Sequence, residues 1–277
     1  MMIEAELSSI NVQPPFSVLM SIYAGNNSSD LNEALLSISQ QTLSPSEVVL
    51  VEDGFISASL SSIVQKYRLA LNIVSVKLEK NMGHGYALNF GLKKCSNDIV
   101  ARMDGDDICL PRRFQLQVEH LMSHPNVSVS SGRIDEFVNT TNNIVGSRSL
   151  PCGHKEIVRF AKYRSPVSHP AVIFRKADVL SVGGYPEVHP EDYPLWCLML
   201  SKGFLFSNIN ETILLMRVGD SFQSRRGWRF YLSEINMVKY QYKIGFISLL
   251  ELIISLTLRL FLRSSPKAIR SLIYKNR

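Results

Sequence analysis

Short apolar runs alternate with longer segments of mixed polarity through the first half of the chain. Each run is too short for a helix and is typical of a buried strand, while the segments between them contain helix-capping and turn-forming residues. The expected strands lie at 17–23, 47–51, 72–77 and 99–103, and the expected helices at 30–41, 59–68, 83–92 and 111–124. Strands that alternate with helices predict a parallel α/β sheet. After a leader at 1–15, we therefore expect residues 16–125 to form a nucleotide-binding half of Rossmann type.

The second half of the chain is less regular, and we expect residues 126–243 to complete the same domain. Its expected strands lie at 128–137, 171–175, 204–208 and 212–218, and its expected helices at 156–163 and 190–202. Residues 221–228, between the last expected strand and the C-terminal segment, are polar and rich in arginine.

The C-terminal segment is apolar over residues 244–262, which is nearly long enough to span a bilayer. Polar residues recur in it at intervals of three and four and form one stripe on a helix: Ser248, Glu251, Ser255, Arg259 and Arg263. No acidic residue follows Glu251, whereas six basic ones do. An amphipathic helix lies on a membrane rather than crossing it, so we interpret residues 244–277 as a basic membrane-associating tail. A helix packed on the domain, or an oligomer contact, is the alternative.

Composition narrows the class of protein. The chain has 277 residues, 45% of them hydrophobic, and a formal net charge of +6. Its four cysteines match no metal-binding spacing and indicate a reducing compartment, and the N-terminus lacks the pattern of a cleaved signal peptide. The positive charge lies beside an apolar helix rather than among exposed aromatic residues, which disfavours a nucleic-acid-binding protein.

Three carboxylates follow the strand expected at 99–103. Asp104, Asp106 and Asp107 fall at its carboxyl end, where open α/β sheets bind their ligands. Asp53 follows the strand at 47–51 in the same way, so one cleft can hold all four acids. Crowded carboxylates repel each other, and a divalent cation such as Mg²⁺ or Mn²⁺ removes that cost. The alternative is a solvated loop that caps the next helix.

The glycine pattern bears on how phosphate is bound. The chain has no GxxxxGKS/T loop and no GxGxxG after its first strand, which disfavours a P-loop enzyme and a dinucleotide-binding fold. These absences favour a nucleotide whose diphosphate is held by a metal ion, where the metal can stabilise a leaving diphosphate.

The remaining candidates each have a structural interpretation beside the functional one. Glu191 and Asp192 begin an expected helix, where they are caps or a general base. Trp196 lies one helical turn after Asp192, and its ring either stacks on a sugar or packs in the core. Arg225 and Arg226 suit phosphate recognition or are surface charges. A lone histidine such as His169 is by itself more often structural.

Five motifs in order now resemble a known family, and they cover roughly residues 16–230. They are Glu52-Asp53-Gly54, Asn81-x-Gly83 with Ala87-Leu88-Asn89-x-Gly91, Asp104-Gly105-Asp106-Asp107, Gly183-Gly184-Tyr185 and Glu191-Asp192-Tyr193-x-Leu195-Trp196. The order is similar to that of inverting family 2 glycosyltransferases with the GT-A fold, a Rossmann-like mixed sheet flanked by helices. Within the family it resembles bacterial β1,3-glucosyl- and galactosyltransferases that act on a sugar-diphosphate-lipid.

The resemblance implies an activity. A UDP-sugar would donate glucose or galactose to GlcNAc or GalNAc on a polyprenyl diphosphate, with Mn²⁺ or Mg²⁺ as cofactor. The product would be β-linked, by the β1,3 bond that the resemblance implies, and would enter O-antigen or another surface polysaccharide. The site of action would be the inner leaflet at the cytoplasmic face of the bacterial inner membrane, with the protein bound peripherally. Alternatives are a transferase for lipopolysaccharide core or capsule that uses a UDP-N-acetylhexosamine, and a non-catalytic scaffold.

The resemblance also implies roles for single residues. The nucleotide-sugar would contact six of them: Tyr23, Asp53, Asn81, Asp104, Arg225 and Arg226. Asp106, together with Asp104, would bind the metal. Asp192 would be the catalytic base, supported by Glu191, and His169 and Trp196 would lie on the acceptor side.

The chain departs from the family pattern at two places that bear on the site. The first strand ends in Ser21-Ile22-Tyr23-Ala24 rather than in a Pro-x-Tyr-Asn type of turn. Many relatives have a histidine after the last strand as a further metal ligand, whereas the segment Arg217-Val218-Gly219-Asp220 offers none. The third ligand is therefore left open between Asp220 and water.

Overall fold

The computed structural model describes residues 13–186, 190–219 and 228–264. Arg225 and Arg226 therefore lie outside the described residues. So do most of the expected leader and most of the second half of the expected tail. Asp220 lies outside them as well.

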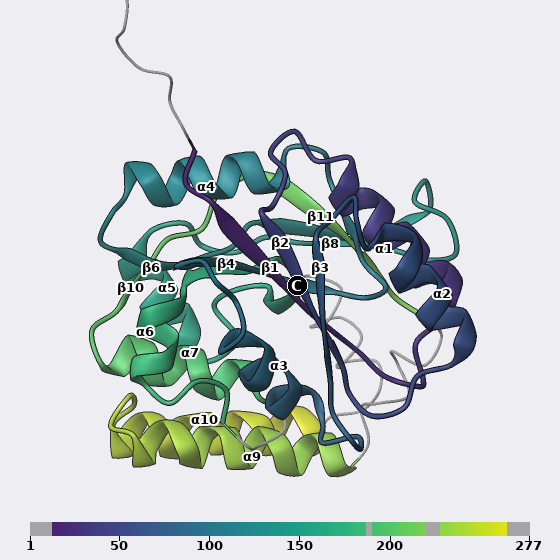
Figure 1. Ribbon diagram of the computed structural model, residues 1–277. Helices are drawn as coiled ribbons and strands as arrows, with labels where there is room; N and C mark the ends of the chain where they lie inside the picture. The colour runs from purple at the N-terminus through teal and green to yellow at the C-terminus, as the bar shows by residue number, and fades with distance from the viewer. Residues whose placement is uncertain (1–12, 187–189, 220–227, 265–277) are drawn as a thin grey trace, which may run out of the picture.

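A seven-stranded sheet forms the centre of the molecule, in the order β10-β6-β9-β4-β1-β2-β3 (Figure 1). Its parallel strands from the first half of the chain are β1 (Phe16–Ile22), β2 (Glu47–Glu52), β3 (Ile73–Lys77) and β4 (Ile99–Asp104). The second half contributes β6 (Val127–Ser130), β9 (Ile173–Arg175) and β10 (Leu205–Phe206). β9 runs antiparallel to both β4 and β6, so the sheet is mixed, as expected.

Helices cover both faces of this sheet. One face packs against α1 (Ser28–Ser39), α2 (Ala58–Tyr67) and α4 (Arg113–Ser123). The other packs against α3 (His84–Leu92), α5 (His154–Ala161), α6 (Lys176–Ser181) and α7 (Asp192–Ser201). Successive strand residues point to opposite faces, so on β1 Val18 and Met20 join the first core and Leu19 joins the second. All four strands and all four helices expected in the first half are present, with ends shifted by at most a few residues.

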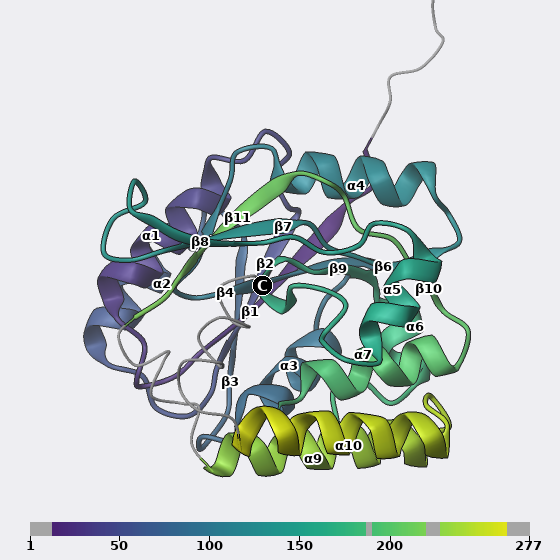
Figure 2. The ribbon, with the colours of Figure 1, turned by 180° about the vertical axis from the view of Figure 1, so that it is seen from behind.

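A smaller, four-stranded sheet lies beside the first, in the order β5-β11-β7-β8 (Figure 2). Its strands are β5 (Ile108–Cys109), β7 (Arg133–Phe137), β8 (Ile144–Arg148) and β11 (Thr212–Arg217). The single strand expected at 128–137 is wrong, because β6 and β7 belong to different sheets. The chain changes sheet at Ser131, whose backbone N–H donates to Asn208 Oδ1 (2.9 Å), and at Gly132, where a Cβ would lie 2.7 Å from Ile213.

Two helices, α9 (Trp228–Lys243) and α10 (Leu249–Ser264), end the described chain and lie beneath α3 and α7 in both views (Figures 1 and 2). Helix α10 begins at Leu249 rather than at Ile244, where the apolar segment of the sequence begins. The chain turns between these positions at Gly245, which has φ 72°. Ser248 and Glu251 then form a capping box, in which Ser248 N–H donates to the Glu251 carboxylate (2.8 Å) and Glu251 N–H to Ser248 Oγ (3.3 Å). Within the described ranges no helix has the length and hydropathy needed to cross a bilayer.

Candidate active site

The acidic cluster lies at the carboxyl end of β4, between β1 and β9, as the sequence predicts. Asp104 is the last residue of the strand, and the tight turn that follows carries Asp106 and Asp107. One carboxylate oxygen from each residue lies within 4.8 Å of the other two. The three groups thus surround a common point.

The charges of this cluster fit a divalent cation. Burial, followed by the neighbouring Asp104, raises the pKa of Asp106 to about 6. The pKa of Asp107 is well above its usual range, again through burial first and then through Asp104 and Asp106. Carboxylates that resist ionisation because they crowd each other are stabilised as anions by a bound cation. Oxygen ligands of this kind suit Mg²⁺ or Mn²⁺.

The three carboxylates are not equivalent. Asp107 is buried, and its Oδ1 accepts a hydrogen bond from the backbone N–H of Arg217 on β11 (2.9 Å). Asp104 and Asp106 are only half-buried. Arg217 also donates from Nε to the Asp106 carbonyl (3.0 Å) and from Nη2 to Glu33 on α1 (2.7 Å). Arg217 therefore ties the acidic turn to β11, and Asp104 and Asp106 are the open ligands.

Arg102 was not predicted from the sequence as a site residue. It lies on β4 two positions before Asp104, on the same face of the strand, and its side chain is 3% exposed. Both terminal nitrogens bind the Asp104 carboxylate, and Nη1 lies 2.6 Å from Oδ2. Nη2 also lies 2.7 Å from Nε2 of His84. The signal in the sequence was a single cation inside an otherwise apolar buried strand.

Asp53 organises the loop that follows β3. Its buried carboxylate accepts hydrogen bonds from the backbone N–H groups of Met82 (2.7 Å) and Gly83 (3.1 Å). The loop can approach because Gly54 has φ 83°, and a Cβ there would lie 2.6 Å from the backbone nitrogen of Asn81. Asn81 itself is exposed and donates to the Asp53 carbonyl (3.4 Å). Asp53 is thus buried beneath this loop and holds its backbone, while Asn81, distant in sequence, is exposed beside it.

A second link joins α3 to the turn that precedes α7. The Asn89 side chain accepts from the backbone N–H of Tyr185 (2.7 Å) and donates to its carbonyl (2.6 Å). Gly184 makes this approach possible, because it has φ 76° and a Cβ there would lie 2.3 Å from Asn89 Oδ1. These contacts explain why the asparagine of the Ala87-Leu88-Asn89 motif and the Gly-Gly-Tyr motif occur together.

Glu191 and Asp192 stand at the N-terminus of α7, where the helix dipole favours negative charge. Burial, and then the charge of Glu191, raises the pKa of Asp192 to about 6. A carboxylate with a pKa near neutrality is well matched to general-base work.

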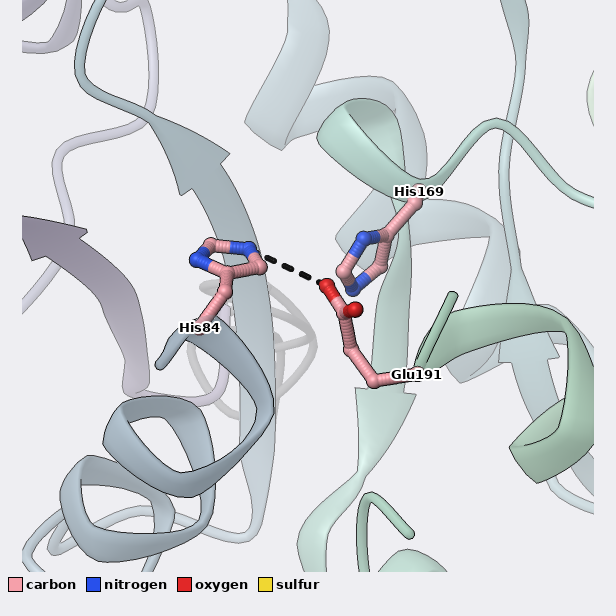
Figure 3. Close-up of side chains that lie close together, drawn as sticks. All are labelled: His84, His169 and Glu191. Atoms are coloured by element: carbon pink, nitrogen blue, oxygen red, sulfur yellow. Dashed lines mark ion pairs between the residues drawn. The ribbon is translucent and has the colours of Figure 1, made fainter. Parts of the chain in front are cut away.

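His84 from the start of α3 and His169 from a short 3-10 helix (His169–Ala171) point towards Glu191 (Figure 3). His84 Nε2 lies 3.8 Å from Glu191 Oε1, and one ligand atom of each residue lies within 4.8 Å of the others. The Arg102 guanidinium at 2.7 Å takes the Nε2 lone pair of His84 that a metal ion needs, and Nδ1 is occupied by Ser21 Oγ (2.9 Å). His84, His169 and Glu191 are therefore better described as a hydrogen-bonding wall of the site than as a second metal site.

The structure places the predicted acceptor residues at different depths. His169 is half-buried, and its Nε2 lies 3.2 Å from the Tyr185 hydroxyl. Trp196 is fully buried and packs against the rings of Phe174 and Phe206, with centroids 6.4 and 6.2 Å away. Of the two interpretations of Trp196, this geometry favours core packing behind His169, whose ring lies 6.1 Å away. Tyr23, at the end of β1, is half-exposed.

Comparisons with known proteins agree with this geometry. The chain is 38% identical over 264 residues to a UDP-Gal:alpha-D-GlcNAc-diphosphoundecaprenol beta-1,3-galactosyltransferase of Escherichia coli, and the alignment covers 95% of this chain and 96% of that protein. It is 36% identical over 262 residues to the amylovoran biosynthesis glycosyltransferase AmsE of Erwinia amylovora, covering 94% and 98% of the two chains.

Solved structures show the same fold. Residues 1–349 of S. aureus TarS, in complex with UDP-GlcNAc, superpose with a TM-score of 0.61 at 21% identity, over 82% of this chain and 66% of that one. This likeness is one of fold, and it confirms the expected GT-A architecture. Residues 17–183 match the family described as Glycosyl transferase family 2. With the relatives above, this match confirms the resemblance seen in the motifs: the chain belongs to glycosyl transferase family 2 and is an enzyme that transfers a sugar.

Proposed function

We propose that the protein transfers a hexose, glucose or galactose, from a UDP-sugar to GlcNAc or GalNAc on a diphosphate-lipid, and that the new linkage is β, in the β1,3 position. The observation that carries this proposal is that Glu191, next to Asp192, faces His84 at 3.8 Å, and that Arg102 contacts both His84 and Asp104 of the acidic cluster. The Escherichia coli relative, aligned over nearly its whole length, supports galactose as the first donor to test.

The donor half of the site is the edge formed by β1, β2 and β4. Tyr23, Asp53 and Asn81 would hold the uracil and ribose, and Asp104 would contact the ribose or the cation. Asp104 and Asp106 would hold Mn²⁺ or Mg²⁺, which when bound neutralises charge on the departing diphosphate. Arg102 fixes the direction of the Asp104 carboxylate, because it pairs with both carboxylate oxygens.

The acceptor half is the N-terminus of α7. Asp192 would take the proton from the acceptor hydroxyl as that oxygen attacks the anomeric carbon, and a single in-line displacement inverts an α-linked donor into a β-linked product. Glu191 would support Asp192 through its charge or contact the acceptor directly. His169 and His84 would complete the wall on this side, and Trp196 would hold His169 from behind.

Two further elements of the proposal depend on the sequence. Arg225 and Arg226 would grip a diphosphate, of donor or acceptor, since guanidinium groups pair with phosphate oxygens. The protein would act peripherally at the cytoplasmic face of the bacterial inner membrane, in the synthesis of O-antigen or another surface polysaccharide, because a polyprenyl-linked acceptor stays in the bilayer. It needs no nucleic acid for this role.

A transfer assay tests the proposal. The full chain is incubated with Mn²⁺, a synthetic GlcNAc-diphosphate-lipid and a panel of UDP-sugars, beside Asp106→Ala and Asp192→Ala. Transfer from one UDP-hexose that both variants lose supports the proposal and names the donor. Transfer from a UDP-N-acetylhexosamine to a different acceptor would support a role in lipopolysaccharide core or capsule instead. No transfer and no binding of UDP would leave a scaffold.

A further inference from the structure

The polar stripe of α10 faces the rest of the protein. Glu251 forms an ion pair with Lys162, the residue that follows α5, and Arg259 forms one with Glu234 on α9 (3.2 Å). Ser255, between them on the same stripe, is 5% exposed. The polar stripe predicted from the spacing is thus the surface by which α10 is attached to the domain.

The opposite face of α10 is apolar and exposed. Five large side chains lie there, each between 44% and 68% exposed: Leu249, Leu250, Ile253, Ile254 and Leu258. Their spacing of three and four residues places them along one side of the helix. We call these five residues the α10 ridge. A monomer that leaves such a contiguous row of large apolar side chains in water presents an interaction surface.

We propose that the α10 ridge inserts into the surface of an anionic lipid bilayer and holds the catalytic domain against it in one orientation. The charge of the chain favours this occupant. Arg259 is paired with Glu234, and after it the sequence has no acid and five further basic residues: Arg263, Lys267, Arg270, Lys275 and Arg277. Apolar insertion beside basic residues is the chemistry of a peripheral helix on anionic lipid.

The same charges disfavour a second copy of the chain as the occupant. In a two-fold symmetric contact the same patch meets itself, so the contact would bring together two chains that each carry five basic residues and no acid after Arg259. An anionic leaflet instead attracts them, with a screened attraction that weakens as salt is added.

The attachment of α10 gives the docking a direction. Two ion pairs and the capping box fix the helix, and the hydrogen bond from Lys162, with the bond from Ser248 N–H, lowers the pKa of Glu251 to about 2, so this carboxylate stays ionised. α9 and α10 lie beneath α3 and α7, the helices that begin at His84 and Asp192 (Figure 1). A bilayer on the ridge therefore lies on the side of the molecule covered by these helices. This orientation serves a lipid-linked acceptor and in that respect rests on the proposed function.

Vesicle co-sedimentation of the full chain tests the proposal. The vesicles are phosphatidylcholine with or without phosphatidylglycerol, at low and high salt. The ridge variant is Leu250→Glu with Ile254→Glu, at two exposed positions of α10. The matched control, Leu69→Glu with Met122→Glu, adds the same charge at two other exposed apolar positions.

We expect the native protein and the control to sediment with phosphatidylglycerol vesicles and the ridge variant to lose at least about tenfold in partition. Thermal unfolding and UDP binding should be the same in all three proteins. Binding of the ridge variant equal to that of the control would overturn the proposal. The proposal would also be overturned if the native protein did not bind vesicles and formed a dimer, while the ridge variant stayed monomeric.

A water-soluble acceptor with a short lipid separates this proposal from the proposed function. If the ridge variant transfers sugar to the short acceptor as the native protein does, but loses transfer to acceptor in vesicles, both proposals are supported. If vesicle binding follows the ridge while no protein transfers sugar, docking is supported and the proposed function fails. If transfer occurs and vesicle binding does not, the proposed function is supported and docking fails.

Discussion

The guanidinium group of Arg102 binds the carboxylate of Asp104 through both of its terminal nitrogens, and one of these nitrogens also lies 2.7 Å from His84 Nε2. This buried cation therefore connects the two halves of the site, since His84 in turn faces Glu191 at 3.8 Å. A lysine at position 102 keeps the charge but has one nitrogen, which cannot hold both carboxylate oxygens and His84 together.

Arg102→Lys is accordingly expected to weaken the site and the fold. The free energy of unfolding should fall by about 1–3 kcal/mol, because hydrogen bonds to buried charged groups are lost. UDP affinity in Mn²⁺ should fall with it, by about fivefold or more, since Asp104 loses its fixed direction. Urea unfolding and UDP titration measure the two effects, and Arg112→Lys, at an exposed position, is the control. Native UDP affinity in Arg102→Lys would show that Asp104 does not depend on this pair.

The raised pKa of Asp192 predicts how activity depends on pH. Its pKa is raised to about 6, by burial first and by Glu191 second, and a general base acts only in its ionised form. The value of kcat/KM should therefore fall as the pH drops through about 6 and level off above it. Asp192→Asn should lower kcat by about 10²–10⁴-fold while UDP still binds.

Glu191→Gln separates the two causes of this raised pKa. Removing the neighbouring negative charge makes Asp192 easier to ionise, so the acid limb of the pH profile should move to lower pH. Burial remains, so the limb should stay above the ordinary pKa of an aspartate. A pH–rate profile of the variant beside the native protein measures the shift, and an acid limb that does not move would assign it to another group.

The three carboxylates of the acidic turn should respond differently to amide substitution. Asp106→Asn removes an open anionic ligand and should lower UDP affinity in Mn²⁺ by about 100-fold, because charge stabilisation by a bound metal is worth several kcal/mol. Asp107→Asn should change that affinity little, since this buried group has a strongly raised pKa and an amide oxygen can still accept from Arg217 N–H. Calorimetric titration with UDP and Mn²⁺ compares them, and equal losses would make Asp107 a ligand.

The sequence predicts most of the larger sheet because each of its first strands is a short apolar run closed by turn residues. The acidic cluster was also placed correctly, since parallel strands bring their carboxyl ends to one edge. It did not predict that His84 contacts Ser21 and Glu191, which lie 63 and 107 residues away along the chain. Such contacts depend on how α3 and α7 pack, and no periodicity contains that information.

One error and one open question have the same origin. The expected strand at 128–137 has a strand-like pattern throughout, but Gly132 and Ser131 meet Ile213 and Asn208, and the chain changes sheet there. The polar stripe of α10 was recognised from its spacing alone. Its direction depends on partners on other helices, so only the structure shows that the stripe faces inward.

Those partners lead to a prediction about the dynamics of α10. Arg259 and Glu234 lie 3.2 Å apart with side chains 15% and 32% exposed, so their ion pair should contribute about 0.5–1 kcal/mol. Arg259→Met should therefore speed hydrogen exchange of α10 backbone amides by about two- to fivefold, the equivalent of that free energy when α10 opens locally. Glu234→Gln should give the same increase, and the double variant should add little, because either change alone breaks the pair. Exchange measured by mass spectrometry on peptides from α10, with peptides from β1 as an internal reference, tests this. Additive effects of the two substitutions would mean that each residue stabilises α10 through a different contact, and the ion pair between them would then contribute nothing to holding the helix.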